Sequence, residues 1–241
     1  MQSGVSEWEN AADEGEKEMD KKLWIQAVTK FLLGILLVTG LLFGSAGSFA
    51  YWQAWLLIGI LFLPMLIAGV VLSRNNPDLL RRRLDAKEEQ TEQKWVVFLS
   101  GLLFLAAFLA AGLNFKFGWI VLPAWVSWGS AVVFLFAYGL YAEVMRENTY
   151  LSRIVEVQEH QKVVDTGLYG VVRHPMYMST LLLFCSMPLV LGSVVSFAIL
   201  LLYLPLLIRR IRNEEQVLED GLDGYAKYKK QVRYRLIPYV W

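Results

Sequence analysis

Charged residues are absent from four long stretches of the chain, and these stretches outline its fold. Residues 31–73, 95–115, 117–142 and 176–208 contain no Asp, Glu, Lys or Arg. A helix needs about 20 predominantly apolar residues to cross the hydrocarbon core of a bilayer. The pattern therefore predicts an all-α fold, a polytopic bundle of transmembrane helices.

Two of these stretches are long enough for two helices each. Residues 44–48 read Gly-Ser-Ala-Gly-Ser and predict a turn inside the first stretch. Gly192-Ser193 predicts a turn inside the last stretch, which leaves two arms of about 24 Å at 1.5 Å per residue. Such arms are short for a hydrocarbon core of about 30 Å. We therefore expect about six spans, of which the last two form a short hairpin.

The distribution of positive charge predicts the orientation of the bundle. Lys and Arg in short loops favour the cytosolic side of a membrane. The turn at 44–50 has none, whereas the 73–94 loop carries six: Arg74, Arg81, Arg82, Arg83, Lys87 and Lys94. We therefore expect this loop and both termini to be cytosolic. For a chain this short, the expected location is a bacterial or archaeal cell membrane.

The charge pattern divides the chain into three parts. Residues 1–22 are polar and mixed in charge, which predicts a disordered or loosely helical tail and not a cleaved signal peptide. Residues 23–145 hold the N-terminal transmembrane helices and the basic cytosolic loop at 73–94. Residues 146–241 form the candidate catalytic region, with a cofactor turn, the helical hairpin and a C-terminal cytosolic segment.

Composition agrees with a membrane protein and argues against several other classes. The chain is 56% hydrophobic and 14% aromatic, above the usual values for a soluble domain. It contains no G-x-G-x-x-G or G-x-x-x-x-G-K-[S/T] phosphate-binding loop. One cysteine and two histidines are too few for the usual structural zinc site. We expect no metal and no nucleic-acid partner.

The segment before the hairpin, residues 157–177, is the first of two polar segments with candidate chemistry. Pro175 lacks a backbone donor and biases His174 away from helix, so the chain enters the membrane through irregular backbone. Irregular backbone at that depth is tolerated only where protein or a polar cavity satisfies it. One interpretation is a cofactor cleft built from backbone amides, an imidazole and the rings of Tyr169 and Tyr177. The other is that Arg173, His174 and Tyr177 anchor the chain at the membrane interface.

The segment after the hairpin, residues 209–238, lies on the same side of the membrane because a hairpin returns the chain to its starting side. Arg210 and Glu214 are four apart and share one helix face. The pair is either part of a functional site or part of an ordinary solvent-exposed helix face. The favoured interpretation of the cations further on is contact with lipid head groups; these are Lys227, Lys229, Lys230, Arg233 and Arg235.

Five short motifs in this region resemble those of the isoprenylcysteine carboxyl methyltransferase family and its phospholipid methyltransferase relatives. They are V-V-D-T-G-L-Y at 163–169, R-H-P-M-Y at 173–177, E-E-Q-V-L at 214–218, Y-A-K-Y at 225–228 and L-I-P at 236–238. Each motif is short, but their order and separations are fairly specific. The resemblance covers roughly residues 150–241.

The resemblance implies a site for S-adenosylmethionine in a cytosolic pocket, with a lipid-like acceptor that enters laterally between helices. It assigns Arg210 and Glu214 to catalysis, with Arg210 facing the acceptor. The residues between 221 and 224 depart from the family spacing by one position, so Arg209, Arg212 and Glu215 remain substitutes. By motif position the cofactor-binding residues are Gln158, Lys162, Val163, Val164, Tyr169, His174, Pro175, Met176, Tyr177 and Glu214.

The residues leave the acceptor and the enzyme class open. Arg210 could orient a carboxylate or thiolate by charge-assisted hydrogen bonds, whereas an amine would need Glu214 or Glu215 as a base. A membrane reductase of the sterol type, with NADPH bound near the cationic tail, is an alternative. A third is a non-enzymatic membrane protein, which predicts polar residues in the middle of the spans. Oligomeric state has no signal in the sequence.

Overall fold

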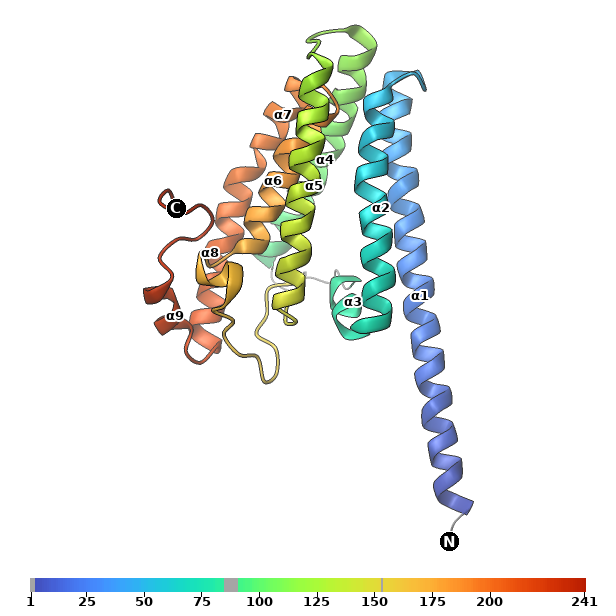
Figure 1. Ribbon diagram of the computed structural model, residues 1–241, viewed down its shortest axis with the longest axis vertical. Coiled ribbons are helices and arrows are strands. Elements are labelled where there is room, and N and C mark those ends of the chain that lie inside the picture. The colour runs from blue at the N-terminus through green and yellow to red at the C-terminus, as the bar shows by residue number, and fades with distance from the viewer. Residues whose placement is uncertain (1–2, 85–90, 153) are drawn as a thin grey trace.

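The computed structural model describes residues 3–84, 91–152 and 154–241, with side chains described from residue 21 onward except at 91 and 92. No strand occurs within these ranges, which confirms the all-α prediction. The long helices are α1 (Ser3–Ala46), α2 (Trp52–Asn75), α4 (Thr91–Phe117), α5 (Ala124–Glu147), α6 (Pro175–Val190) and α8 (Tyr203–Gly221). The short ones are α3 (Pro77–Leu84), η1 (Gly167–Gly170), α7 (Val194–Leu201) and α9 (Tyr225–Gln231) (Figure 1).

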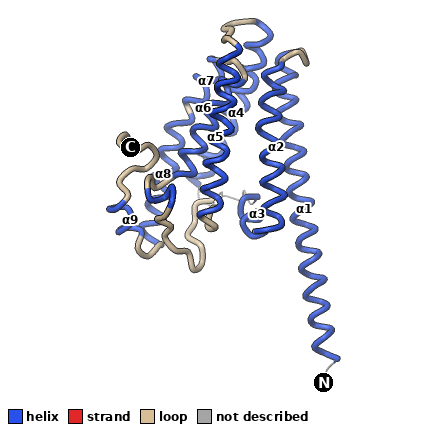
Figure 2. The backbone as a smooth tube through the Cα atoms, in the orientation of Figure 1, coloured by secondary structure: helices blue, strands red, loops and turns tan. Residues whose placement is uncertain are grey.

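Five helical segments in the described residues are long and apolar enough to cross a membrane. They are residues 21–46, 52–75, 93–117, 124–147 and 194–221, and the apolar α6 is shorter. The chain is therefore an integral membrane protein, as predicted. The helices run roughly side by side, and the polar loops gather at one end of the bundle (Figures 1 and 2).

The final hairpin is short in only one of its two arms. Gly192 adopts a φ of +70°, and Ser193 accepts a hydrogen bond from the Ser196 amide at 3.1 Å, so the turn lies where it was predicted. The outgoing arm α6 has 16 residues, but α7 and α8 together make a returning arm of 28 residues. The returning arm is longer than the charge-free run alone, because the charged residues after Ile208 have good helix propensity and continue the helix.

Two details of the N-terminal half differ from the sequence-based expectation. The first turn lies later than 44–48, because α1 continues to Ala46 and Gly47 supplies a φ of +64°. The helix α1 begins at Ser3, so the backbone of the tail is helical, which is one of the two forms expected. The 73–94 loop contains α3, whose start is marked by Asn76, which accepts a hydrogen bond from the Leu79 amide at 3.1 Å, and by a proline at the first helical position.

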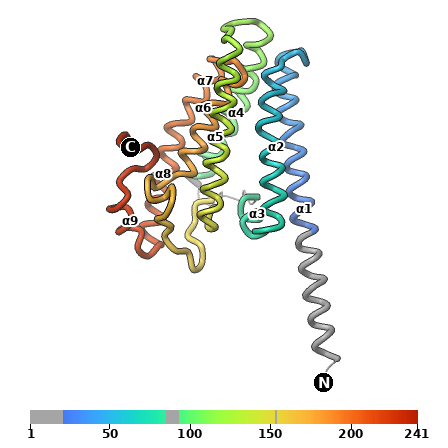
Figure 3. Tube along the Cα trace, in the orientation of Figure 1, coloured from blue at the N-terminus to red at the C-terminus, as the bar shows by residue number. Residues whose placement is uncertain are grey.

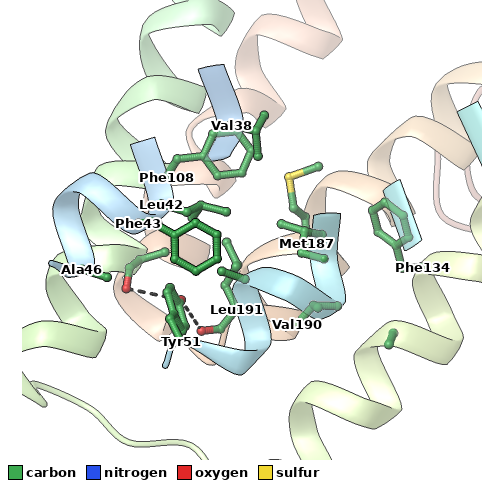
Figure 4. Close-up of a cluster of buried hydrophobic side chains, with 14 of the residues drawn as sticks. Val38, Leu42, Phe43, Ala46, Tyr51, Phe108, Phe134, Met187, Val190 and Leu191 are labelled. Atoms are coloured by element: carbon green, nitrogen blue, oxygen red, sulfur yellow. Dashed lines mark hydrogen bonds between the residues drawn. The ribbon is translucent and has the colours of Figure 1, made fainter. Parts of the chain in front are cut away.

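A buried apolar cluster joins the N-terminal hairpin to the rest of the bundle. Its members come from α1, α2, α4, α5 and α6, and include Leu42, Phe43, Phe108, Phe134, Met187 and Leu191 (Figure 4). The Tyr51 hydroxyl donates to the Leu191 carbonyl oxygen at 2.6 Å, which ties the first turn to the end of α6. At the opposite end of the bundle, α3 lies beside the lower end of α2 (Figure 3).

Candidate active site

The two polar segments that flank the hairpin meet at one end of the bundle. The Arg173 and His174 amides donate to the carbonyl oxygens of Tyr234 and Arg235, each at 2.9 Å. His174 Nδ1 lies 3.8 Å from the Glu214 Oε1 atom. The loop before η1 and the C-terminal segment are neighbours in Figure 1. The hairpin therefore brings the two segments together, so that both can line one cavity.

A turn at Gly167 directs the polar segment before the hairpin toward the polar segment after it. Gly167 has a φ of +49°, and a Cβ atom there would collide with the Glu147 carboxylate. That carboxylate accepts hydrogen bonds from Thr166 Oγ1 at 2.9 Å and from the Leu168 amide at 3.2 Å. The turn favours glycine for its left-handed backbone conformation, and the absence of a side chain lets the Glu147 carboxylate approach. It fixes the course of the chain from α5 into η1.

A buried ionic cluster around Glu215 holds the C-terminal segment against the start of α6. The Glu215 carboxylate accepts from Arg173 Nε at 2.7 Å and from Arg235 Nε at 2.8 Å. His174 Nε2 lies 3.3 Å from the same carboxylate. Arg173 also donates to two carbonyl oxygens of the C-terminal segment, those of Val232 and Arg233, at 2.8 Å.

This cluster corrects two interpretations of the cations. Arg173 and Glu215 are 6% and 3% exposed, so Arg173 is no interfacial anchor. Arg235 lies in the ion cluster and over the Trp241 ring, with Cζ 5.2 Å from the ring centroid. The favoured assignment of Arg235 to a lipid head group is therefore wrong. No local pattern in the sequence indicates that these cations converge on one carboxylate.

Arg210 and Glu214 are linked through a tyrosine hydroxyl. The Tyr177 hydroxyl donates to Glu214 Oε2 and accepts from Arg210 Nε at 3.0 Å. Arg210 Nη1 also donates to the Gln93 Oε1 atom at 3.1 Å. Gln93 is the first residue of the membrane-spanning part of α4, and it is 1% exposed. Sequence reasoning missed Gln93, because a lone amide before an apolar run carries no motif.

A cleft lies between the two segments, and most of the predicted cofactor residues line it. The predicted residues that line it are Lys162, Val163, Val164, Tyr169, His174, Met176, Tyr177 and Glu214. Gln158, Pro175 and Arg210 do not line it. Gln158 instead donates to the Tyr150 carbonyl oxygen at 2.7 Å and so shapes the loop. Lining residues that were not predicted include Asn148, Tyr150, Gln161, Leu218, Tyr225 and Tyr228.

Three buried tyrosines of the cleft are neutral hydrogen-bonding groups. Burial raises the pKa of Tyr169, Tyr225 and Tyr228 well above the ordinary value. The Tyr228 hydroxyl donates to the Tyr169 carbonyl oxygen at 2.8 Å, and Asn148 Nδ2 donates to the Tyr169 hydroxyl at 2.9 Å. The Tyr225 hydroxyl is buried and has no hydrogen-bond partner among the described residues. An orphaned buried hydroxyl in a cleft marks a place where a polar ligand atom fits.

Comparison with known proteins finds one family that resembles this region. Residues 130–220 match the isoprenylcysteine carboxyl methyltransferase (ICMT) family. This part of the chain is therefore similar to that family. The match confirms the family resemblance of the motifs and extends it to α5, while Tyr225, Tyr228 and the C-terminal segment lie beyond the matched residues. The match to this family supports a membrane methyltransferase-like function.

One curated relative comes from the reductase class that the sequence had left as an alternative. Delta(14)-sterol reductase TM7SF2 of Mus musculus is 34% identical to this chain over 84 residues. The aligned segment is 34% of this chain and 20% of the reductase. The chain thus spans about a fifth of the length of that relative. The likeness is partial, and it keeps the reductase as the alternative to test.

Proposed function

We propose that this ICMT-like protein transfers a methyl group from S-adenosylmethionine to a lipid-like or small membrane-accessible acceptor at the polar end of the bundle. The observation that carries the proposal is the cleft itself. It lies within and beside the family match, and its walls include Glu214, His174 and Tyr225 with its orphaned hydroxyl. Aromatic rings and a carboxylate suit an adenosyl group and an amino-acid moiety.

The side chains that line the cleft are of the types that this cofactor needs, but the cleft is smaller than the cofactor. We propose that His174, Met176 and Tyr177 line the cofactor site, with Glu214 as its anionic contact. The cleft encloses about 90 Å³, whereas small-molecule sites usually measure about 300–1,000 Å³. A whole cofactor therefore requires the cleft to widen when it binds.

The chain has two chemical tasks: it aligns the methyl donor with the acceptor, and it excludes water. When bound, S-adenosylmethionine supplies a methyl group already activated on a sulfonium, so the chain needs no covalent nucleophile. Arg210 does not line the cleft but donates to Tyr177 at its wall; we propose that it orients the site through that hydroxyl. For an amine acceptor, Glu214 is the remaining candidate base, because the Glu215 carboxylate is occupied by Arg173, Arg235 and His174.

Calorimetric titration of the purified protein in detergent tests the cofactor class. We expect S-adenosylhomocysteine to bind and NADPH to bind at least about tenfold more weakly, a difference of about 1.4 kcal/mol. We expect His174→Ala and Tyr177→Ala to weaken S-adenosylhomocysteine binding while the helical content stays unchanged. Preferential binding of NADPH would favour the reductase instead. A radiolabel-transfer screen over lipid, thiol and amine acceptors then identifies the reaction.

The Tyr225→Phe variant tests whether the Tyr225 hydroxyl contacts the ligand or stabilises the fold. Removing a buried hydroxyl without a partner leaves the unliganded fold as stable as before or more so, because a desolvation cost disappears. The same change lowers S-adenosylhomocysteine affinity by about 5–10-fold if the hydroxyl binds the ligand, the usual loss of one hydrogen bond of about 1–1.5 kcal/mol. Thermal unfolding and calorimetry measure the two effects.

Tyr228→Phe is the matched control for that prediction. Its hydroxyl already donates to the Tyr169 carbonyl oxygen, so its loss lowers the unfolding temperature. A Tyr225→Phe variant that is destabilised as Tyr228→Phe is, with ligand affinity unchanged, would contradict the assignment of the Tyr225 hydroxyl to the cofactor.

A further inference from the structure

Residues 234–241 turn back along the outside of the bundle, and we call them the C-terminal hook. In Figure 1 the C-terminus lies beside α8 and nearer to the middle of the bundle than α9 does. The Trp241 side chain packs against the buried cluster that contains Tyr203 and Leu207 of α8. Both of these residues belong to the charge-free run at 176–208. The end of the hook therefore lies at the level of the apolar helices and not beyond them.

The backbone of the C-terminal hook satisfies much of its own hydrogen bonding. The Trp241 carbonyl oxygen accepts hydrogen bonds from the amides of residues 235–237 at 2.9, 3.0 and 3.2 Å. The Ile237 carbonyl oxygen accepts from the Val240 and Trp241 amides, each at 3.1 Å. Non-helical backbone is tolerated at membrane depth only where protein or a polar cavity satisfies it. The hook meets this requirement at these amides.

The tip of the hook presents apolar side chains on its surface. Tyr239 and Val240 are 88% and 75% exposed, and Ile237 beside them is exposed as well. Residues 237–240 form a turn whose second residue is Pro238 and whose third is Tyr239. Tyr239 adopts a φ of +65°, and glycine is the usual third residue of a turn with a positive φ there. The tyrosine therefore places a large ring at the tip in spite of an unfavourable backbone conformation.

Exposed cations lie just before the hook. Lys227, Lys230 and Arg233 are exposed on α9 and directly after it. Lysine and arginine are attracted to the head groups of anionic lipids, and tyrosine is enriched at the interface between membrane and water. An apolar tip that follows such cations therefore matches the boundary between the head groups and the acyl chains of a bilayer.

We propose that the C-terminal hook inserts its tip into the leaflet of the membrane on the side of the cleft. Tyr239 and Val240 then lie among the ends of the acyl chains nearest the head groups, while Lys227, Lys230 and Arg233 lie at the phosphates. The partner is the lipid bilayer, and the inference goes beyond the proposed function because it needs neither cofactor nor acceptor. All of these residues follow the family match, which ends at residue 220.

Insertion of the hook connects the membrane to the wall of the cleft. Tyr234 and Arg235 are the first residues of the hook. Their carbonyl oxygens accept hydrogen bonds from the Arg173 and His174 amides, each at 2.9 Å, and His174 lines the cleft. A hook held in the bilayer keeps these acceptors at the start of α6, so it stabilises the two hydrogen bonds.

Nitroxide labels on single cysteines measure the depth of the hook in the full-length protein in nanodiscs. Cys185, the single cysteine of the chain, is first removed as Cys185→Ala, and labels are then attached through Tyr239→Cys and Val240→Cys. Val133→Cys is the lipid reference, because Val133 is 69% exposed on the membrane-spanning α5. Asp223→Cys is the water reference, because Asp223 is exposed in the polar loop between α8 and α9.

We expect oxygen to relax the labels at 239 and 240 more strongly than a water-soluble nickel chelate does, because oxygen concentrates in lipid. The label at 133 shows the same order, and the label at 223 shows the opposite order. Labels at 239 and 240 that both behave like the label at 223 would place the hook in water and overturn the proposal.

A charge at the tip tests whether the bilayer holds the wall of the cleft. A carboxylate is excluded from the acyl chains, so Val240→Asp is expected to move the label at 239 into water, whereas Val240→Leu leaves it in lipid. Hydrogen exchange at the Arg173 and His174 amides, followed by mass spectrometry, is then expected to accelerate about tenfold in Val240→Asp, because their acceptors are no longer held in place. Val240→Leu keeps the wild-type exchange rate.

Unchanged helical content by circular dichroism shows that each variant is folded. If Val240→Asp moves the label at 239 into water but leaves the exchange rate unchanged, the connection between the bilayer and the cleft is overturned. None of these measurements uses a ligand, so their failure leaves the proposed function standing. Absence of S-adenosylhomocysteine binding to the wild type would instead overturn the proposed function and leave the inserted hook standing.

Discussion

Glu215→Ala is expected to detach the C-terminal segment from α6 and to abolish cofactor binding with it. The carboxylate neutralises the buried Arg173 and binds Arg235 from the C-terminal segment. Removing one partner of a buried ion pair leaves an uncompensated buried charge and costs about 3–5 kcal/mol. That is a large part of the roughly 5–15 kcal/mol that stabilises a typical fold.

Thermal unfolding in detergent and calorimetric titration with S-adenosylhomocysteine measure the two expected losses. Glu219→Ala is the matched control, one helical turn further along α8. Glu219 pairs with Lys229 at 2.9 Å, but the two side chains are 37% and 31% exposed. A surface pair contributes only about 0–1 kcal/mol, so this variant keeps its stability and its ligand affinity.

A double variant shows whether the buried charge is the cause. Arg173→Met combined with Glu215→Leu replaces the ion pair by apolar side chains of similar size. Such replacements are often close to neutral, so the double variant is expected to be more stable than Glu215→Ala alone. A double variant that is less stable than the single one would show that Arg173 stabilises the fold mainly through its hydrogen bonds to the Val232 and Arg233 carbonyl oxygens.

The helical framework was predictable because it depends on local pattern. Charge-free runs of span length and small residues at the two turns are visible in the sequence, and the bundle follows from them. The start of α3 was also visible in Asn76-Pro77-Asp78. It was missed because the surrounding Lys and Arg residues were interpreted only as a topology signal.

The partition of roles within the site was not predictable. Glu214 and Glu215 are neighbours on α8, and successive residues of a helix point about 100° apart. One therefore lines the cleft, and the other enters the buried ion cluster. Gln93 lies 117 residues before Arg210, and no local pattern connects them. Roles of this kind depend on packing between helices, which a single sequence does not contain.

Arg210→Ala is expected to reduce turnover far more than cofactor binding. The side chain is a positioning residue: it joins Tyr177, at the wall of the cleft, to Gln93 on α4. Its loss leaves the Tyr177 hydroxyl and the Glu214 carboxylate without one of the groups that fix them. A misplacement of about 1 Å costs about 100-fold in rate, so we expect kcat to fall by about that factor while S-adenosylhomocysteine affinity changes less than about threefold.

Two further variants show whether position or charge explains this loss. Arg212→Ala removes an exposed cation of the same helix and keeps full activity. Gln93→Ala leaves the charge of Arg210 in place but removes its anchor on α4, so a positioning role predicts a fall in kcat without a rise in KM. If Gln93→Ala has no effect while Arg210→Ala raises KM for the acceptor, Arg210 contacts the acceptor directly. If the Arg210→Ala variant instead loses S-adenosylhomocysteine binding, the main role of Arg210 is to hold the Glu214 carboxylate in the position that binds the cofactor.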